Sequence, residues 1–193
     1  MTDKKALLYD SAKELFAEKG LKDTSVADIT QAAGVAVGTF YLYYPSKDRL
    51  FMEIFGQENA FMMKRLMRSI DLTEEPVPLI KKLLSLNMEG MLSNPILRQW
   101  YEKDVSEKIE KLYREENGIG GVGFLYGDFL RMVSKWQDQG KMRSDIDSSM
   151  IMAMFESIIR IGFLKEEIGL QYFPELQNHL TDFVLRGLTD CKK

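Results

Sequence analysis

The chain has 193 residues, of which 45% are hydrophobic and 28% are charged, and its formal net charge is -3. This length and composition indicate a globular protein that can bury a sizeable core, and they exclude a low-complexity or disordered chain. Because the net charge is negative, nucleic acid could be bound only through a local surface, since nothing attracts it to the protein as a whole.

The N-terminal segment and the cysteine content predict the compartment. The first residues are polar and amphipathic, without a continuous apolar stretch, so we expect no signal peptide. No run of 18 apolar residues occurs, so we expect no membrane-spanning segment. Cys191 is the only cysteine, which leaves no intrachain disulfide. These features predict a cytoplasmic protein in a reducing compartment.

Two helices are predicted near the N-terminus. Apolar residues recur at helical spacing over residues 4–19, and Gly20 ends this pattern. A second helix is predicted over about residues 26–33. Ser25 precedes it as an N-cap, and Asp28 stands three residues later, which is the spacing of a capping box.

A third short helix and a long fourth helix follow. Gly34 can adopt the left-handed conformation that ends the second helix, and the next helix is predicted over about residues 37–43. Pro45 cannot continue that helix. Ser46 is the predicted N-cap of a helix that runs to about residue 69.

The rest of the chain is also helical by its pattern, because alternating runs of β-branched residues do not occur. Five further helical segments are predicted, at about residues 77–93, 95–116, 122–139, 147–168 and 174–190. The sequence therefore predicts an all-α fold of about nine helices.

The second and third predicted helices, with the turn at Gly34 between them, form a helix-turn-helix. Proteins that use this motif place its second helix in the major groove of DNA. On this second helix Phe40 and Tyr44 are four residues apart and share the inward face. Its other faces carry hydroxyls that can donate to phosphate oxygens, on Thr39, Tyr41 and Tyr43. Aromatic residues on a short helix also form ordinary cores, so this pattern alone leaves both interpretations open.

Residues 24–55, TSVADITQAAGVAVGTFYLYYPSKDRLFMEIF, closely resemble the N-terminal module of the tetracycline-repressor (TetR) family of bacterial regulators. The detailed similarity begins at about residue 6, and beyond residue 55 only length and helix content are alike. The resemblance implies an N-terminal three-helix DNA-binding domain with a helix-turn-helix over residues 1–46. It implies a larger helical ligand-binding and dimerisation domain over residues 47–193.

The resemblance also implies which residues contact a double-stranded DNA operator. Phosphate contacts are implied for Thr24 and Ser25 at the start of the second helix. Further phosphate contacts are implied for residues of the third helix and the start of the fourth, namely Thr39, Tyr41, Tyr43 and Lys47. The residues implied to lie nearest to base edges are Val37, Gly38 and Thr39.

Three residues depart from the family's pattern. Thr30 stands where alanine is usual, and Ala36 stands where a capping serine or threonine is common. Val37 replaces a residue that is often polar or basic. The side chains of Ala36 and Val37 cannot hydrogen-bond to base edges, but they can touch thymine methyl groups. We therefore expect much of the sequence selectivity to come from apolar contact and from DNA shape.

The C-terminal part is rich in adaptable apolar side chains. Both tryptophans lie after residue 50, and so does every methionine except Met1. Taken singly, each of these residues is explained as an ordinary residue of the hydrophobic core. As a group, under the resemblance, they imply a cavity for a small apolar or aromatic effector. The predicted pocket residues are Met62, Met88, Met91, Trp100, Tyr101, Phe124, Phe129 and Trp136. Gln99, Asn87 and Arg98 are candidate polar anchors.

The last two predicted segments are candidates for a dimer interface. Segment 147–168 is apolar nearly all round, so something besides its own core must cover one side. The resemblance implies that it packs with segment 174–190 against the same helices of a second copy. The predicted interface residues of this homodimer are Phe155, Ile158, Ile159 and Phe183.

Three functions remain open from the sequence. The first is a dimeric, ligand-responsive transcriptional regulator, expected to be a repressor, that binds a palindromic operator with half-sites about 34–36 Å apart. The second is a small-molecule carrier or sensor whose DNA reader is vestigial. The third is a metal-free enzyme, which the lack of phosphate-binding, metalloprotease and nucleophile-elbow motifs opposes. We expect no catalytic residues, no metal and no cofactor.

Overall fold

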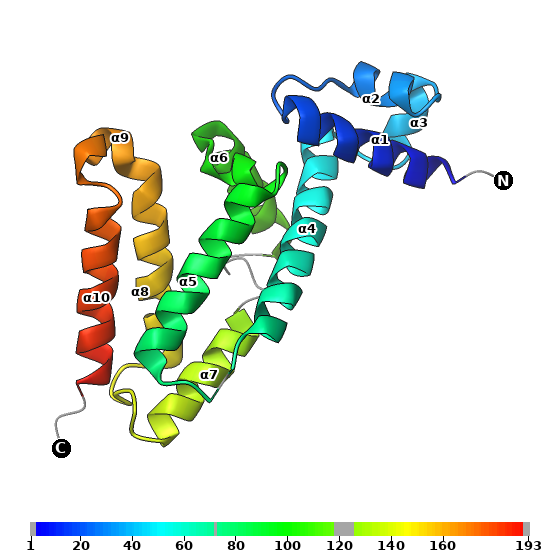
Figure 1. Ribbon diagram of the computed structural model, residues 1–193. Coiled ribbons are helices and arrows are strands. Elements are labelled where there is room, and N and C mark those ends of the chain that lie inside the picture. The colour runs from blue at the N-terminus through cyan, green and yellow to red at the C-terminus, as the bar shows by residue number, and fades with distance from the viewer. Residues whose placement is uncertain (1–2, 72, 118–125, 191–193) are drawn as a thin grey trace. The chain divides into compact units, whose positions relative to one another are not determined.

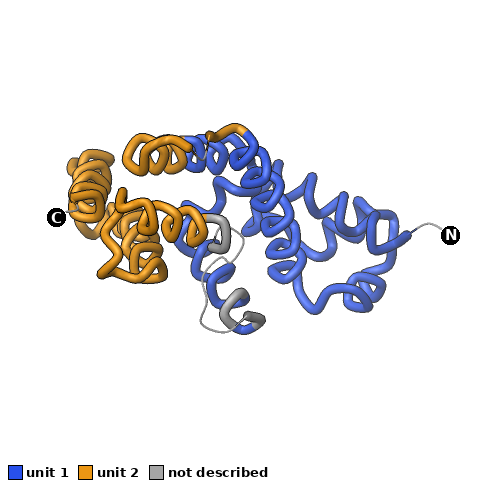
Figure 2. Tube along the Cα trace, turned by 90° about the horizontal axis from the view of Figure 1, so that it is seen from below, with its two compact units in different colours: residues 1–68, 86–120 blue, residues 69–85, 121–193 orange. Residues whose placement is uncertain are grey.

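The computed structural model describes residues 3–71, 73–117 and 126–190, and all regular secondary structure in these ranges is helical (Figure 1). The predicted all-α fold is therefore confirmed. The chain divides into two compact units, which Figure 2 shows in two colours. Unit 1 comprises Met1–Arg68 and Leu86–Gly120, and unit 2 comprises Ser69–Ser85 and Gly121–Lys193. None of the described helices is long and apolar enough to cross a membrane.

The first four helices begin and end within two residues of their predicted bounds. They are α1 (Lys4–Lys19), α2 (Val26–Ala32), α3 (Val37–Tyr41) and α4 (Lys47–Ser69). α1 starts where the Asp3 carboxylate accepts from the backbone N–H groups of Lys5 and Ala6, and it ends at Gly20, whose φ is 82°. A side chain is strained at such a φ, so glycine fits this stop.

Two of the later segments are not continuous helices, contrary to prediction. Segment 95–116 is divided into η1 (Leu97–Tyr101) and α6 (Lys103–Asn117), because Glu102 between them is extended with ψ 116°. Segment 147–168 changes to 3-10 geometry after Ile161. The other elements are α5 (Pro76–Ser93), α7 (Tyr126–Asp138), α8 (Ser148–Ile161), η2 (Gly162–Leu164), α9 (Lys165–Ile168), η3 (Leu170–Tyr172) and α10 (Glu175–Thr189).

Unit 1 has its own aromatic core. Phe16 of α1 meets Phe51 of α4 edge to face, with 5.2 Å between the ring centroids, and both side chains are fully buried. Phe40 of α3, and Leu97 of η1, belong to the same buried cluster. Burying one such side chain contributes about 1.5–3 kcal/mol. The short helices α2 and α3 are thus held by packing rather than by their own length.

Unit 2 has a separate core around Trp136 of α7, which is fully buried. Phe129 packs edge to face on Phe155 of α8, with 5.8 Å between centroids. The loop after α7 is fixed by Gln137, whose Nε2 donates to the carbonyls of Arg143 and Ile146. These contacts hold α7, α8 and the loop between them as one packed body.

The predicted division at residue 46 differs from the division into units, because helix α4 and residues 86–120 belong to the same unit as α1–α3. The two divisions rest on different criteria. The units are defined by packing, whereas the predicted domains are defined by function. The domain boundary at residues 46 and 47 stays a prediction.

Candidate nucleic-acid interface

A capping box fixes the start of α2, as predicted. The backbone N–H of Asp28 donates to Ser25 Oγ over 3.1 Å, and the backbone N–H of Ser25 donates to Asp28 Oδ2 over 2.8 Å. The Ser25 hydroxyl also donates to Asp28 Oδ2 over 2.6 Å. These bonds, the one from the hydroxyl first, lower the pKa of the Asp28 carboxyl and keep it charged. The carboxylate thereby complements the positive end of the helix.

The turn between α2 and α3 requires a glycine for conformational reasons. Gly34 has φ 64°, and a Cβ at this position would meet no atom within 4 Å. The requirement is therefore for the left-handed backbone and not for space. Thr30, a departure from the family's pattern, is buried, and its hydroxyl donates to the carbonyls of Val26 and Ala27 within α2. The departure therefore leaves no polar group unsatisfied.

Helix α3 and the residues that directly follow it have one buried side and one exposed side. Phe40 on α3 and Tyr44 just after it are both buried, which confirms that these two residues point inward. Tyr41 is 57% exposed, and Val37 and Tyr43 are exposed as well. Ala36, at the N-cap, makes no side-chain hydrogen bond, as predicted. The remaining predicted contact residues of this segment are exposed or half-buried, namely Ala36, Gly38 and Thr39.

The prediction from sequence missed Leu42, which is the C-cap of α3 and is 80% exposed. It stands between the two exposed tyrosines, Tyr41 and Tyr43. The signal was present in the sequence, because a leucine between two residues assigned to the surface does not fit the inward positions of Phe40 and Tyr44.

Tyr44 lies under this surface and differs in chemistry from the exposed tyrosines. Burial, followed by the nearby Glu53 charge, raises the pKa of Tyr44 to about 12. Among the described residues its hydroxyl has no hydrogen-bond partner. The Lys5 ammonium lies 5.5 Å from the centroid of its ring. Tyr44 is therefore a core residue whose hydroxyl stays protonated, and it contributes through the packing of its aromatic ring.

Two residues predicted to contact phosphate are engaged in the turn between α1 and α2. The Thr24 side chain is buried, and its hydroxyl donates to the carbonyl of Gly20 over 2.7 Å. The Lys47 ammonium donates to the carbonyls of Leu21 (2.7 Å), Thr24 (2.6 Å) and Lys22 (3.3 Å). A phosphate bound by Lys47 would compete with these carbonyls, because an ammonium has three protons. The DNA contacts of Thr24 and Lys47 stay predictions.

The predicted pocket residues are divided between the units. In unit 1, Trp100 stacks on Phe55 with 5.7 Å between centroids, and Met62 and Met91 belong to the same apolar cluster. Met62 lies so close to Gly90 that a Cβ on Gly90 would be 2.5 Å from its sulfur. The other members in unit 1, Met88 and Tyr101, are exposed. In unit 2, Phe129 and Trp136 pack in the core, and Phe124 lies outside the described residues.

Of the candidate polar anchors, Gln99 has a different role from the one predicted. Its side chain is only 4% exposed, and its amide is hydrogen-bonded to the backbone of α1 and of the turn that follows. No described cluster of three or more histidine, cysteine, aspartate or glutamate side chains is placed to hold a metal ion.

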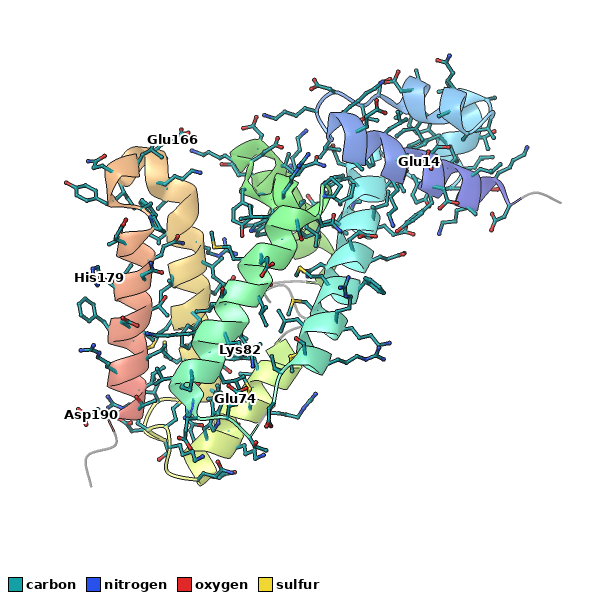
Figure 3. The ribbon with its side chains drawn as sticks, viewed as in Figure 1. Glu14, Glu74, Lys82, Glu166, His179 and Asp190 are labelled. Atoms are coloured by element: carbon teal, nitrogen blue, oxygen red, sulfur yellow. The ribbon has the colours of Figure 1, made fainter. Side chains whose placement is uncertain are left out.

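The predicted interface residues have two different environments. Phe155 and Ile158 are buried in the core of unit 2, whereas Ile159 and Phe183 are exposed, Phe183 by 66%. The ring of His179 stacks on Phe183, with 6.3 Å between centroids, and projects from α10 away from α8 (Figure 3). Only the exposed pair, Ile159 and Phe183, has surface left for a second copy. The interface stays a prediction.

Residues 8–54 match the family described as bacterial regulatory proteins, tetR family. The chain is 25% identical over 192 residues to the uncharacterized HTH-type transcriptional regulator YdgC of Bacillus subtilis (strain 168), covering 97% of this chain and 84% of YdgC. It is 29% identical over 94 residues to the uncharacterized regulator YuxN of the same strain, covering 49% of this chain but only 32% of YuxN. It is 29% identical over 84 residues to the HTH-type transcriptional repressor KstR2 of Mycobacterium tuberculosis (strain ATCC 25618 / H37Rv), covering 44% and 42% of the two chains.

Solved structures share the fold. RolR in complex with resorcinol superposes with a TM-score of 0.70 at 16% identity, covering 97% of this chain and 89% of that one. The transcriptional regulator FadR of Bacillus subtilis, in complex with stearoyl-CoA, superposes with a TM-score of 0.61 at 17% identity, covering 98% and 100%. At these identities the likeness concerns the fold alone.

Proposed function

Because this chain belongs to the tetR family of transcriptional regulators, we propose that it is a dimeric repressor whose release from DNA is controlled by a small molecule. Helix α3 of each copy would enter the major groove at one half of a palindromic operator. A small apolar or aromatic effector would bind in the C-terminal helical domain. The family and the relatives are transcriptional regulators, so the chain is a regulator and not an enzyme.

The observation that carries the proposal is the two-sided character of α3. Its inward residue Phe40 is fully buried, while Val37, Tyr41 and Tyr43 are exposed within a segment of seven residues. A short helix that buries one side and presents apolar and hydroxyl groups on the other is suited to the major groove. Tyrosine and threonine hydroxyls can donate to phosphates, and valine can contact thymine methyl groups.

The surface of unit 2 supports a homodimer. Among the described residues of unit 2, the exposed large apolar side chains lie between residues 150 and 183, on α8, η2, α9, η3 and α10. Monomers rarely leave large contiguous apolar patches in water. Ile159 of α8 and Phe183 of α10 are the best candidates for the centre of an interface. A two-fold dimer would then present two copies of α3 about one turn of DNA, or about 34–36 Å, apart.

The similar proteins support a repressor that responds to an apolar or aromatic compound. KstR2 is a repressor, RolR binds resorcinol and FadR binds stearoyl-CoA. The methionine and aromatic residues after residue 50 suit such a compound, since they adapt to irregular apolar shapes. The effector could lower operator affinity only by binding more tightly to a conformation that does not fit the operator. A regulator of this kind would act in the cytoplasm.

Selection of bound duplexes from a random DNA pool, followed by sequencing, tests the proposal. We expect a palindromic consensus whose half-sites are one helical turn apart. The variant Tyr41→Ala, which removes an exposed side chain predicted to contact phosphate, is the matched control: it should fold normally and bind the selected operator more weakly than the wild type. If the folded, dimeric wild type enriches nothing, the repressor is excluded and the carrier with a vestigial reader is favoured.

A further inference from the structure

Gln99 is a buried polar residue that joins two distant parts of unit 1. It lies on η1, and both N–H groups of its amide donate over 2.9 Å, one to the carbonyl of Phe16 and one to that of Pro95. Its Oε1 accepts from the backbone N–H of Leu21 over 2.8 Å. A buried amide is costly unless it is hydrogen-bonded, and here both donors and the acceptor are used.

The two distant partners of Gln99 are the last turn of α1 and the turn that follows it. The final carbonyls of a helix have no partner within the helix. The carbonyl of Phe16 accepts from Gly20 N as well as from Gln99 Nε2. A Cβ on Gly20 would lie 3.5 Å from Gln99 Oε1. The amide therefore lies directly against the point where the chain leaves α1.

The same turn is held from its other side by Lys47 of α4. Leu21 gives its N–H to Gln99 Oε1, and its carbonyl accepts from Lys47 Nζ. Lys47 Nζ also donates to the carbonyl of Thr24, which directly precedes the N-cap of α2. Two side chains from outside the α1–α2 segment thus fix the backbone that leads into the helix-turn-helix.

We infer that Gln99 is a positioning residue for DNA binding. Its amide holds the α1–α2 turn, and through this turn the start of α2, in the geometry that fits the operator. It acts from η1, well beyond the part of the chain that matches the family, so residues outside that match complete the DNA reader. The inference rests on the proposed function. The ion pair of Lys22 with Asp104, over 2.7 Å, also ties this turn to α6, but both side chains are exposed and such pairs contribute little.

The variant Gln99→Met tests the inference, because methionine keeps the length and volume of the side chain and removes its hydrogen bonds. The matched control is Ile109→Val, which loses packing in the same buried cluster without removing a hydrogen bond to the turn. Both are compared at a temperature at which both are at least nine-tenths folded, with the operator obtained by selection on the wild type. We expect Gln99→Met to bind that operator at least tenfold more weakly than Ile109→Val.

A double-mutant cycle separates positioning from general loosening. If α2 and α3 are displaced, Tyr41→Phe should weaken binding less in the Gln99→Met background than in the Ile109→Val background. Equal affinity of Gln99→Met and Ile109→Val, or equal cost of Tyr41→Phe in both backgrounds, would overturn the inference. If Gln99→Met does not fold, Gln99→Asn replaces it, since it keeps the amide but is one methylene too short to make all three hydrogen bonds, and a fivefold loss is expected. Failure of the wild type to bind any duplex refutes instead the proposed function.

Discussion

The two units differ in where they place polar and apolar side chains. All described polar residues that are buried, Thr24, Thr30, Gln99 and Ser106, belong to unit 1. Unit 2 buries only apolar side chains among its described residues, and it exposes large apolar groups from Met150 to Phe183. Both units expose large apolar side chains, so the difference lies in their interiors: unit 1 buries side chains that make directional hydrogen bonds, whereas the described interior of unit 2 is apolar.

This difference corresponds to two tasks. Buried hydrogen bonds specify one backbone geometry, because any other arrangement leaves polar groups unsatisfied. A DNA reader needs such a geometry, since its contacts must meet fixed positions on the duplex. Apolar packing tolerates rearrangement more readily, which suits a unit proposed to bind an effector and a second copy.

The largest effect is expected from charge on the exposed apolar surface of unit 2. The double variant Ile159→Glu/Phe183→Glu should convert the proposed dimer to a monomer, because neither glutamate can be buried without a partner. Operator affinity should fall more than a hundredfold, since a monomer binds one half-site whereas a dimer binds two at once. Sedimentation velocity and operator titration measure both effects. Phe61→Glu, at a residue of unit 1 that is similarly exposed, should leave the dimer intact. If the double variant still sediments as a dimer, the interface lies elsewhere on the chain.

A smaller effect is expected for Lys47, through the turn that it holds. Lys47→Ala removes donors to three carbonyls, and we expect the free energy of unfolding to fall by about 1–2 kcal/mol. Operator affinity should fall about tenfold or more. Tyr41→Phe is the comparison, since it removes only an exposed hydroxyl. It should lower the affinity for the operator without changing the midpoint of unfolding in denaturant. An unchanged unfolding midpoint in Lys47→Ala would show that these bonds do not stabilise the turn.

The capping box predicts a dependence of stability on pH. Because folding lowers the pKa of Asp28, its carboxylate stabilises the fold above the ordinary value of 3.8, and this contribution is lost as pH falls through the lowered value. Asp28→Asn should therefore unfold at a lower urea concentration than the wild type at pH 7. The difference should shrink as the pH falls below 3.8. A difference that does not shrink at any pH below 3.8 would show that the charge is not responsible.

The smallest effect is expected for Tyr44. Its buried hydroxyl has no partner among the described residues, so Tyr44→Phe removes a polar group that gains nothing from its position. The free energy of unfolding should stay the same or rise by up to about 1 kcal/mol, as measured in urea. A clear loss of stability would mean that the hydroxyl is hydrogen-bonded, for instance through water.

The sequence allowed the first four helices to be predicted because their ends are marked locally. Ser25 with Asp28, Gly34 and Ser46 each act within three or four residues. The break at Glu102 was missed. The start of the 3-10 helix before it is marked locally, because Asn94 Oδ1 accepts from the N–H groups of Ile96 and Leu97. An asparagine before a proline was a local signal for that start.

The roles of Gln99 and Lys47 could not be predicted in this way. Apart from the bond between Gln99 and Pro95, their hydrogen bonds join residues that are from 23 to 83 positions apart, and no local pattern records such a pair. For the same reason the exposed and buried members of the predicted dimer interface were not distinguished. Phe155 and Ile159 are four residues apart on α8, but the first packs on Phe129 and the second is exposed.

The central claim is that two copies of the DNA reader act together on one palindromic operator. The most direct measurement is binding to the selected operator and to the same duplex with five base pairs inserted between the half-sites, about half a helical turn. We predict two chains per duplex on the intact operator and a loss of affinity of at least a hundredfold on the lengthened one. Equal affinity for the two duplexes would contradict the claim, because each reader would then be binding by itself.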